Sequence, residues 1–216
     1  MTASPICFLR GTRILTSKGE ICVENLRIGD RVETLRGNPL PIRWIGRQLF
    51  KKASDSRWHE SVLPVRISRF ALDDRAPHTD LYLSPGHQLY LDCVLIPVKL
   101  LVNGASIVQG LPDGMDEIEY FHVELERHEV IFAEGAAAET LLATNGREHF
   151  SNFIEYERLY GIDSGATMLP YAPLVGYNGG RSELKALLRR VASPIIDIRD
   201  PIQVAYDRIV TRELVG

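Results

Sequence analysis

The sequence LYLSPGHQLYL, residues 81–91, places two arms of apolar and aromatic residues on either side of the corner Ser84-Pro85-Gly86-His87. Proline restricts φ to about −65° and glycine tolerates positive φ, so this corner is typical of a chain reversal. The aromatic residues in both arms suit a pleated, half-buried surface. The stretch therefore predicts two strands joined as a β-hairpin.

Similar patterns recur along the first two thirds of the chain. Residues 120–134 predict a second hairpin, because apolar residues at 121, 123 and 125 alternate with polar residues at 122, 124 and 126. Lys18-Gly19 marks a turn between two further strand-like arms. Shorter strand-like runs lie at residues 20–24, 28–32, 41–45 and 63–67. Many short strands separated by turns indicate a mainly β body rather than a parallel α/β sheet.

The last third of the chain changes to helical patterns. Apolar spacing and capping residues predict helices over 147–160, 183–192 and 202–214. Asp200-Pro201 supplies a cap and a first helical residue for the last of these. Proline and glycine are frequent between residues 168 and 180, which predicts a loop. We expect a mainly β body with a mostly helical C-terminal extension.

Composition narrows the class of protein. The 216 residues are 45% hydrophobic and 25% charged, with a net charge of −3, which fits a globular fold and argues against a disordered chain or a dedicated nucleic-acid binder. The longest apolar-leaning run, residues 94–102, contains a lysine and is too short to span a bilayer. The opening MTASPICFLRG lacks the pattern of a signal peptide, so we expect a cytoplasmic chain if Met1 is the true start.

Four residues are candidates for chemistry: Cys7, Ser84, His87 and His128. A thiol is a nucleophile, and a hydroxyl three residues from an imidazole can face the same small target as that ring. Taken singly, each has an ordinary structural explanation, since a cysteine in an apolar strand is usually a small buried hydrophobe. Cys22 and Cys93 keep that explanation and are expected in the core. The remaining histidines have no partner at the spacing of metal ligands, so no metal site is predicted.

The order of the candidates along the chain matches a known pattern. CFLRGTRILT at residues 7–16, followed by IGDRV at 28–32, resembles the first sequence block of the Hint superfamily. This is the self-processing domain shared by inteins and the C-terminal part of Hedgehog proteins. LSPGHQL at residues 83–89 resembles the second block, with Ser84 in the place of the usual threonine.

A third match extends the resemblance. Residues 120–135 resemble the penultimate block of the superfamily, with His128 at its histidine position. The three blocks cover about residues 7–145, and three ordered blocks are far more specific than any one of them. The chain is similar to bacterial Hint-domain proteins that lack a complete splicing apparatus. The resemblance implies a compact all-β Hint-type fold.

The resemblance also implies a reaction. Cys7 would attack the Ile6-Cys7 peptide bond and convert it to a linear thioester. His87 would act as general acid for the leaving amide nitrogen, an effect typically worth ~10²–10⁴ in rate. Ser84 would bind the scissile amide or orient His87, and His128 would support the intermediate or its resolution. No cofactor is implied.

The final block departs from the intein pattern. Ala138-Glu139 stands where inteins end with His-Asn, and glutamate has no amide nitrogen with which to cyclise, so full splicing is not expected. The thioester would instead be resolved by water or another nucleophile such as a thiol, once per molecule. Glu139 is a candidate activator of that nucleophile, or simply an exposed glutamate. A degenerate Hint fold that serves as a binding or structural module is the competing hypothesis.

The expected organisation has three parts. Residues 1–6 form a leader or the remnant of a longer upstream polypeptide, which would be the partner of the reaction in cis. Residues 7–145 form the Hint domain, and residues 146–216 form the helical extension.

Overall fold

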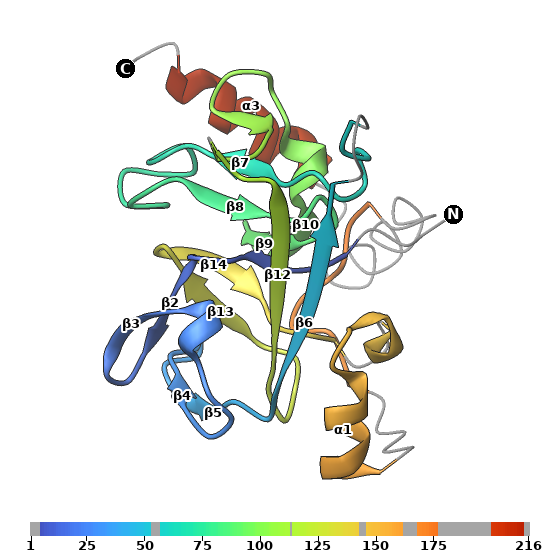
Figure 1. Ribbon diagram of the computed structural model, residues 1–216. Coiled ribbons are helices and arrows are strands. Elements are labelled where there is room, and N and C mark those ends of the chain that lie inside the picture. Colours follow the sequence, from blue (N-terminus) through green and yellow to red (C-terminus); the bar gives the residue numbers. More distant parts are fainter. Residues whose placement is uncertain are drawn as a thin grey trace.

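The computed structural model describes residues 5–52, 57–112, 114–142, 146–161, 168–176 and 200–213, and its strands form two antiparallel sheets (Figure 1). The first sheet contains, in spatial order, β11 (Ile107–Gln109), β7 (Val65–Ile67), β8 (Leu81–Leu83), β1 (Phe8–Leu9), β12 (Glu117–Glu124) and β6 (Trp44–Lys51). The second contains β10 (Val94–Pro97), β9 (Gln88–Leu91), β14 (Ala136–Glu139), β13 (Val130–Ala133), β2 (Arg13–Thr16), β4 (Arg31–Val32) and β5 (Leu40–Pro41). β3 (Gly19–Cys22) pairs with β2. The expectation of a mainly β fold is confirmed.

Both hairpins predicted from residues 81–91 and 120–134 are wrong in the same respect, although all their strands form. β8 pairs with β1 and β7 in the first sheet, whereas β9 pairs with β10 and β14 in the second. β12 likewise belongs to the first sheet and β13 to the second. Local alternation indicates which residues are extended, but it does not identify their pairing partners. The two corners therefore carry the chain from one sheet to the other.

The actual hairpins use neighbouring turns. β2 and β3 are joined at the predicted Lys18-Gly19 turn, and β13 and β14 are joined through Glu134-Gly135. β9 and β10 are joined through Asp92-Cys93, both with positive φ. This turn leaves Cys93 exposed and Cys22 is half-buried, so the expectation that both lie in the core is wrong.

Two groups of buried apolar side chains stabilise the fold. The larger one includes Phe8, Leu83, Phe121 and Ile131 from both sheets, and its members are almost completely inaccessible to water. The smaller one contains Cys7 and Leu9, Trp44, Tyr120, Phe150 and Tyr156. β1 contributes to both groups because successive residues of a strand point to opposite sides. The residue that precedes β1 is consequently buried among aromatic rings.

The segment predicted as a helix over 147–160 begins as the 3-10 turn η3 (Arg147–His149), and its α-helix, α1, spans only Phe153–Tyr160. The break has a structural cause. The backbone N–H of Ser151 donates to the carbonyl of Arg47, and the side chain of Asn152 accepts from the Arg47 N–H at 2.8 Å. These bonds fasten the chain to β6, beside which α1 lies (Figure 1).

The last helix, α3 (Pro201–Glu213), confirms the prediction made from Asp200-Pro201. The carboxylate of Asp200 accepts from the N–H of Ile202 at 3.1 Å, as an N-cap does. Ala205 and Ile209 are buried in the larger core group, so the helix packs on the β body near the 3-10 turn η2 (Val98–Leu101). A third 3-10 turn, η1 (Val23–Asn25), follows β3.

Two further predictions concern the part of the chain between α1 and α3. The helix predicted over 183–192 lies outside the described residues. Residues 168–176, part of the predicted loop, run along β10, where Leu174 forms an isolated bridge to Leu95. No helix among the described residues is long and apolar enough to cross a membrane.

Candidate active site

The end of β8 and the beginning of β1 lie side by side, which brings Cys7 next to Ser84. Phe8 pairs with Leu83 in an antiparallel ladder, and the ladder continues by one step because the N–H of Ser84 donates to the carbonyl of Cys7 at 2.9 Å. Both residues are completely buried. Residues 77 positions apart in the sequence thus meet at the seam between the two sheets.

The Ser84 hydroxyl contacts both sides of the Ile6-Cys7 peptide bond. Its oxygen accepts a hydrogen bond from the backbone N–H of Cys7 at 2.7 Å. The same hydroxyl donates to the carbonyl of Pro5 at 2.7 Å. A single hydroxyl can act as donor and acceptor at once, and here both capacities are used. Ser84 therefore fixes the conformation of residues 5–7.

The Cys7 thiol is held in its neutral form. Burial raises its pKa above the ordinary value of a cysteine, and the backbone of Ile6 opposes part of that shift. The thiol belongs to the smaller core group, whose Tyr120 donates its phenolic hydrogen to the carbonyl of Val62 at 2.7 Å. A thiol in such surroundings becomes a nucleophile only if a nearby base takes its proton.

The His87 ring lies beside Cys7. The backbone N–H of His87 donates to the carbonyl of Ser84 at 3.0 Å, and the His87 carbonyl accepts from the backbone N–H of Val98 at 2.8 Å, so backbone hydrogen bonds fix the corner. The ring centroid lies 4.3 Å from that of Phe8. Burial lowers the pKa of His87 to about 3, while backbone groups of Glu139 and Cys7 favour the charged form. Within the described residues neither ring nitrogen makes a hydrogen bond of normal geometry, so one nitrogen is free to accept a proton and the other to donate one.

His122 is a member of this cluster that the sequence did not indicate. It lies on β12 with its ring centroid 5.1 Å from that of His87, and it is fully buried with no hydrogen-bond partner in the part of the chain that the structure describes. Burial, and then the neighbouring His87 and His128, lower its pKa well below the usual value. The alternating pattern predicted residue 122 on the polar face of its strand. In the structure both faces of β12 are buried, so His122 is buried as well.

His128 and Glu139 form a buried pair at the second corner. Glu139 Oε2 lies 3.2 Å from His128 Nε2, and both side chains are completely inaccessible to water. Glu139 Oε1 accepts from the backbone N–H of Gln88 at 3.0 Å, which links the pair to the residue after His87. Burial raises the pKa of Glu139, and the hydrogen bond with His128 opposes that shift. Glu139 is therefore not the exposed glutamate that was one of the two expectations.

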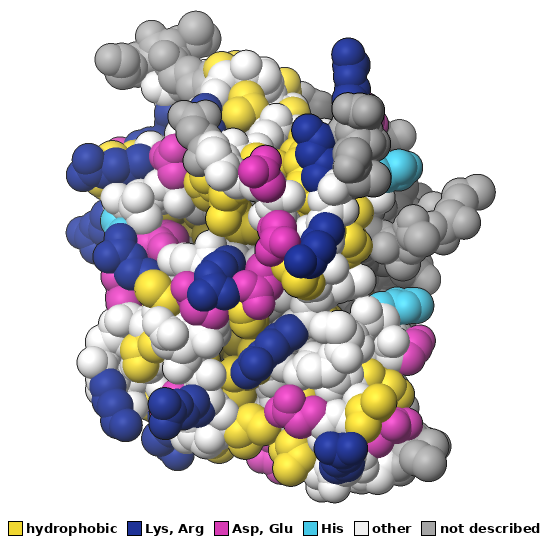
Figure 2. All heavy atoms as spheres, in the orientation of Figure 1, with side chains coloured by type: hydrophobic (Ala, Val, Ile, Leu, Met, Phe, Trp, Pro, Cys, Tyr) yellow, Lys and Arg dark blue, Asp and Glu magenta, His cyan; other side chains and the backbone are white. Residues whose placement is uncertain are grey.

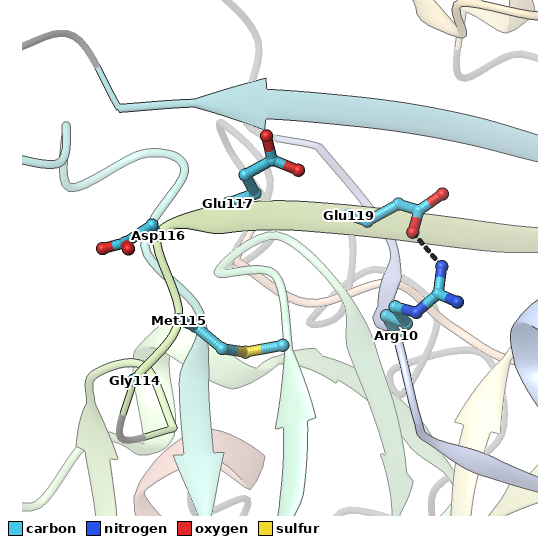
Figure 3. A pocket seen from close by; sticks show the side chains of 6 residues that line it. All are labelled: Arg10, Gly114, Met115, Asp116, Glu117 and Glu119. Atoms are coloured by element: carbon cyan, nitrogen blue, oxygen red, sulfur yellow. Dashed lines mark hydrogen bonds and ion pairs between the residues drawn. The ribbon is translucent and has the colours of Figure 1, made fainter.

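Two features of the surface lie outside this cluster, a cavity and a group of charged side chains. A surface cavity of about 380 Å³ lies at one end of β12, and Arg10 is directed across it toward Glu119 (Figure 3). None of the four candidate residues lines it. On the face shown in Figure 2, acidic and basic side chains are interspersed.

The second feature is a cluster of Glu20, His78 and Glu134. Among the described residues it is the group with three possible metal ligands within 4.8 Å of one another. The guanidinium of Arg13 lies 3.3 Å from Glu134 and 3.8 Å from Glu20. Because a cation of the chain already lies between the carboxylates, the cluster is an ion-pair network of the fold.

Solved structures similar to this chain include inteins and an intein-like domain. Among solved structures, the chain is similar to an intein, MchDnaB-1, with 12% identity over 62% of this chain and 99% of that one and a TM-score of 0.41. A bacterial intein-like domain from Clostridium thermocellum matches with 12% identity, 64% and 100% coverage and a TM-score of 0.38. A DnaB intein from Synechocystis sp. PCC 6803 matches with 6% identity, 62% and 98% coverage and a TM-score of 0.40.

No curated protein matches the chain. The family model of the Hint domain matches residues 6–145, well over half of the sequence. The chain therefore belongs to the Hint domain family.

Proposed function

We propose that this Hint domain cleaves the peptide bond between Ile6 and Cys7 by an N–S acyl shift in cis. The Cys7 sulfur attacks the carbonyl carbon of Ile6, the bond from that carbon to the Cys7 nitrogen breaks, and the thiol proton ends on the released amine. The product is a thioester between Ile6 and Cys7. The observation that carries this proposal is the Ser84 hydroxyl, which bonds the Cys7 N–H and the Pro5 carbonyl on either side of the scissile bond.

His87 would move the proton. With a pKa of about 3 its ring is neutral near pH 7, so it first accepts a proton from the Cys7 thiol and then donates it to the amide nitrogen. The unpaired ring nitrogens and the backbone of Cys7 facing the ring support this role. His87 thus acts as general acid with a proton that it has received from the nucleophile.

The thioester would be resolved by water or a thiol rather than by splicing. Glu139 occupies the place where cyclisation would require an asparagine, and its carboxylate is engaged by His128 and Gln88. The reaction then occurs once per molecule. In this proposal residues 1–6 belong to the cleaved part, 7–145 form the processing domain and 146–216 form an extension of it.

A second candidate function is a Hint fold kept as a binding or structural module without cleavage. One observation favours it: burial raises the pKa of Cys7 and lowers that of His87, which disfavours a thiolate and an imidazolium alike. Because both groups resist ionisation, the site could be chemically silent.

A fusion experiment distinguishes the two functions. A reporter domain is placed ahead of Met1, and the intact mass is followed with and without dithiothreitol or hydroxylamine. We expect cleavage between Ile6 and Cys7 that these nucleophiles accelerate, none in Cys7→Ala, and unchanged cleavage in Cys93→Ala, whose cysteine is exposed. An intact fusion, or equal cleavage in Cys7→Ala, would overturn the autoprocessing proposal.

A further inference from the structure

A backbone hydrogen bond fixes which ring nitrogen of His128 carries the proton, and its donor lies outside the residues that match the Hint domain model. The N–H of Tyr171 donates to His128 Nδ1 at 2.9 Å. A backbone N–H can only donate, so Nδ1 is unprotonated and the ring proton lies on Nε2, which faces Glu139. Tyr171 lies beyond residue 145, where the match to the Hint domain model ends.

The arrangement of His128 and Glu139 is that of a general base. In such pairs a carboxylate binds one ring nitrogen and orients the imidazole, and the other nitrogen takes the proton of the nucleophile. Burial raises the pKa of Glu139, and the hydrogen bonds that its two oxygens accept, from His128 and from Gln88, oppose that shift. The nitrogen left for the nucleophile is Nδ1, and Tyr171 occupies it.

Residues 168–176 hold Tyr171 over this nitrogen, and we name them the strap. Pro173 accepts a hydrogen bond from Leu95 at 2.9 Å, and Val175 donates to the Leu95 carbonyl at 3.0 Å. The Tyr171 ring lies 4.6 Å from the guanidinium of Arg36 and edge-on to the ring of Tyr90. Met168 and Val175 of the strap are also buried, whereas Leu169 is 80% exposed.

The pair is connected to the cleavage site through the chain. Gln88, whose N–H binds the Glu139 carboxylate, directly follows His87. The backbones of Glu139 and Cys7 both face the His87 ring and favour its charged form. The pair and the cleavage site thus share the His87 corner, and the proposal below requires that a nucleophile activated at His128 reach the Ile6 acyl carbon from it.

We propose that His128, oriented by Glu139, is the base for the acyl acceptor that resolves the thioester, and that the strap blocks this base through Tyr171. The proposal rests on the proposed function. When the strap opens, water gives a proton to His128 Nδ1 and its oxygen bonds to the Ile6 acyl carbon. The carbon–sulfur bond breaks, and the imidazolium returns the proton to the Cys7 thiolate. His128 ends neutral, and the products are a carboxylic acid and a free thiol.

The strap is tested with Tyr171→Pro, which lacks the backbone N–H. Tyr171→Ala is the matched control, because it removes the ring and keeps the N–H. In the reporter fusion, dithiothreitol release measures thioester formation, and release in buffer alone measures hydrolysis. We expect Tyr171→Pro to hydrolyse at least tenfold faster than wild type and faster than Tyr171→Ala, with unchanged dithiothreitol release, and Glu139→Gln to abolish the gain.

A second readout does not depend on cleavage. Hydrogen exchange at the C2 position of each histidine, followed by mass spectrometry of the full chain, reports access to its ring. We expect faster exchange at His128 in Tyr171→Pro and no change at His87. Unchanged exchange at His128, or equal hydrolysis in the Pro and Ala variants, would overturn the strap proposal. A chain that opens at His128 but forms no thioester would overturn the proposed function and with it the role of the base.

Discussion

Replacing Ser84 by alanine separates a structural from a chemical role of its hydroxyl. The change removes two hydrogen bonds of 2.7 Å, to the Cys7 N–H and the Pro5 carbonyl, and leaves the buried N–H unpaired. A net contribution of about 1 kcal/mol for the bond to Pro5 and a penalty of about 1–3 kcal/mol for the buried Cys7 N–H left unpaired give a loss of stability of about 2–4 kcal/mol. Cleavage slows only to the extent that these bonds strengthen in the transition state, and a strengthening of about 2 kcal/mol as the amide nitrogen leaves would slow Ser84→Ala about 30-fold.

The assay measures both quantities on the same protein. Urea denaturation gives the free energy of unfolding, and the reporter fusion gives the rate of dithiothreitol-induced cleavage. Ser84→Thr is the control, because it keeps the hydroxyl and adds one methyl group, at a packing cost of about 1 kcal/mol. We expect it to cleave within about fivefold of wild type, well inside the loss expected for alanine. A Ser84→Ala protein that is folded and less stable but cleaves as fast as wild type would refute a chemical role of the Ser84 hydroxyl.

Three further predictions concern the surroundings of the site. The pKa of His87 is about 3 in the fold, below its usual value, so between pH 6.5 and 3 the unfolded chain binds a proton that the folded chain does not. The stability present above pH 6.5 is therefore lost as the pH falls toward 3, by up to about 1.4 kcal/mol per pH unit. His87→Phe should reduce this slope in pH-dependent denaturation, and an unchanged slope would contradict the assignment. Gly46→Ala places a Cβ 2.6 Å from the Phe150 ring and should cost about 1–3 kcal/mol in urea denaturation, whereas Gly110→Ala, with no atom within 4 Å, should not; equal effects would refute the packing argument. Buried Cys7 should alkylate at least about 100-fold more slowly than the chain's exposed cysteine, as mass spectrometry of labelled peptides would show, and fast labelling of native protein would show that the thiol is accessible.

The strand content of the fold could be predicted from the sequence, but its pairing could not. Alternation and turn residues predicted extended chain on both sides of Ser84-Pro85-Gly86-His87, and β8 and β9 form there. β8 pairs with β1 and β7, and β9 pairs with β10 and β14; β1 and β14 lie far from these strands in the sequence. Local patterns specify the conformation of a strand and not its neighbours, so a change of sheet at the corner resembles a hairpin.

The candidate residues were identified by order and resemblance, and the structure places them at two related points. Ser84 and His87 lie at one corner between the sheets and His128 at the other, with Cys7 beside the first. His122 was missed because no spacing distinguishes a buried histidine from an exposed one on a strand buried on both faces. The contact of Tyr171 with His128 could not be predicted either, since a backbone donor leaves no mark on residue type.

The burial of the site decides how a reaction can proceed there. A cluster at the seam of two sheets excludes water, which strengthens the hydrogen bonds of Ser84 and penalises every separated charge. Transfer of the thiol proton to His87 and onward to the amide nitrogen begins and ends with neutral groups, so the burial that disfavours a resting thiolate leaves the balance between peptide and thioester largely unaffected. Hydrolysis differs, because its acid product is charged near pH 7 and water has to enter. In the proposed reaction, thioester formation therefore suits the closed fold, whereas resolution requires an opening. Opening at the strap would break its backbone bonds to Leu95 and the bond from Tyr171 to His128, but no pairing between the strands of either sheet.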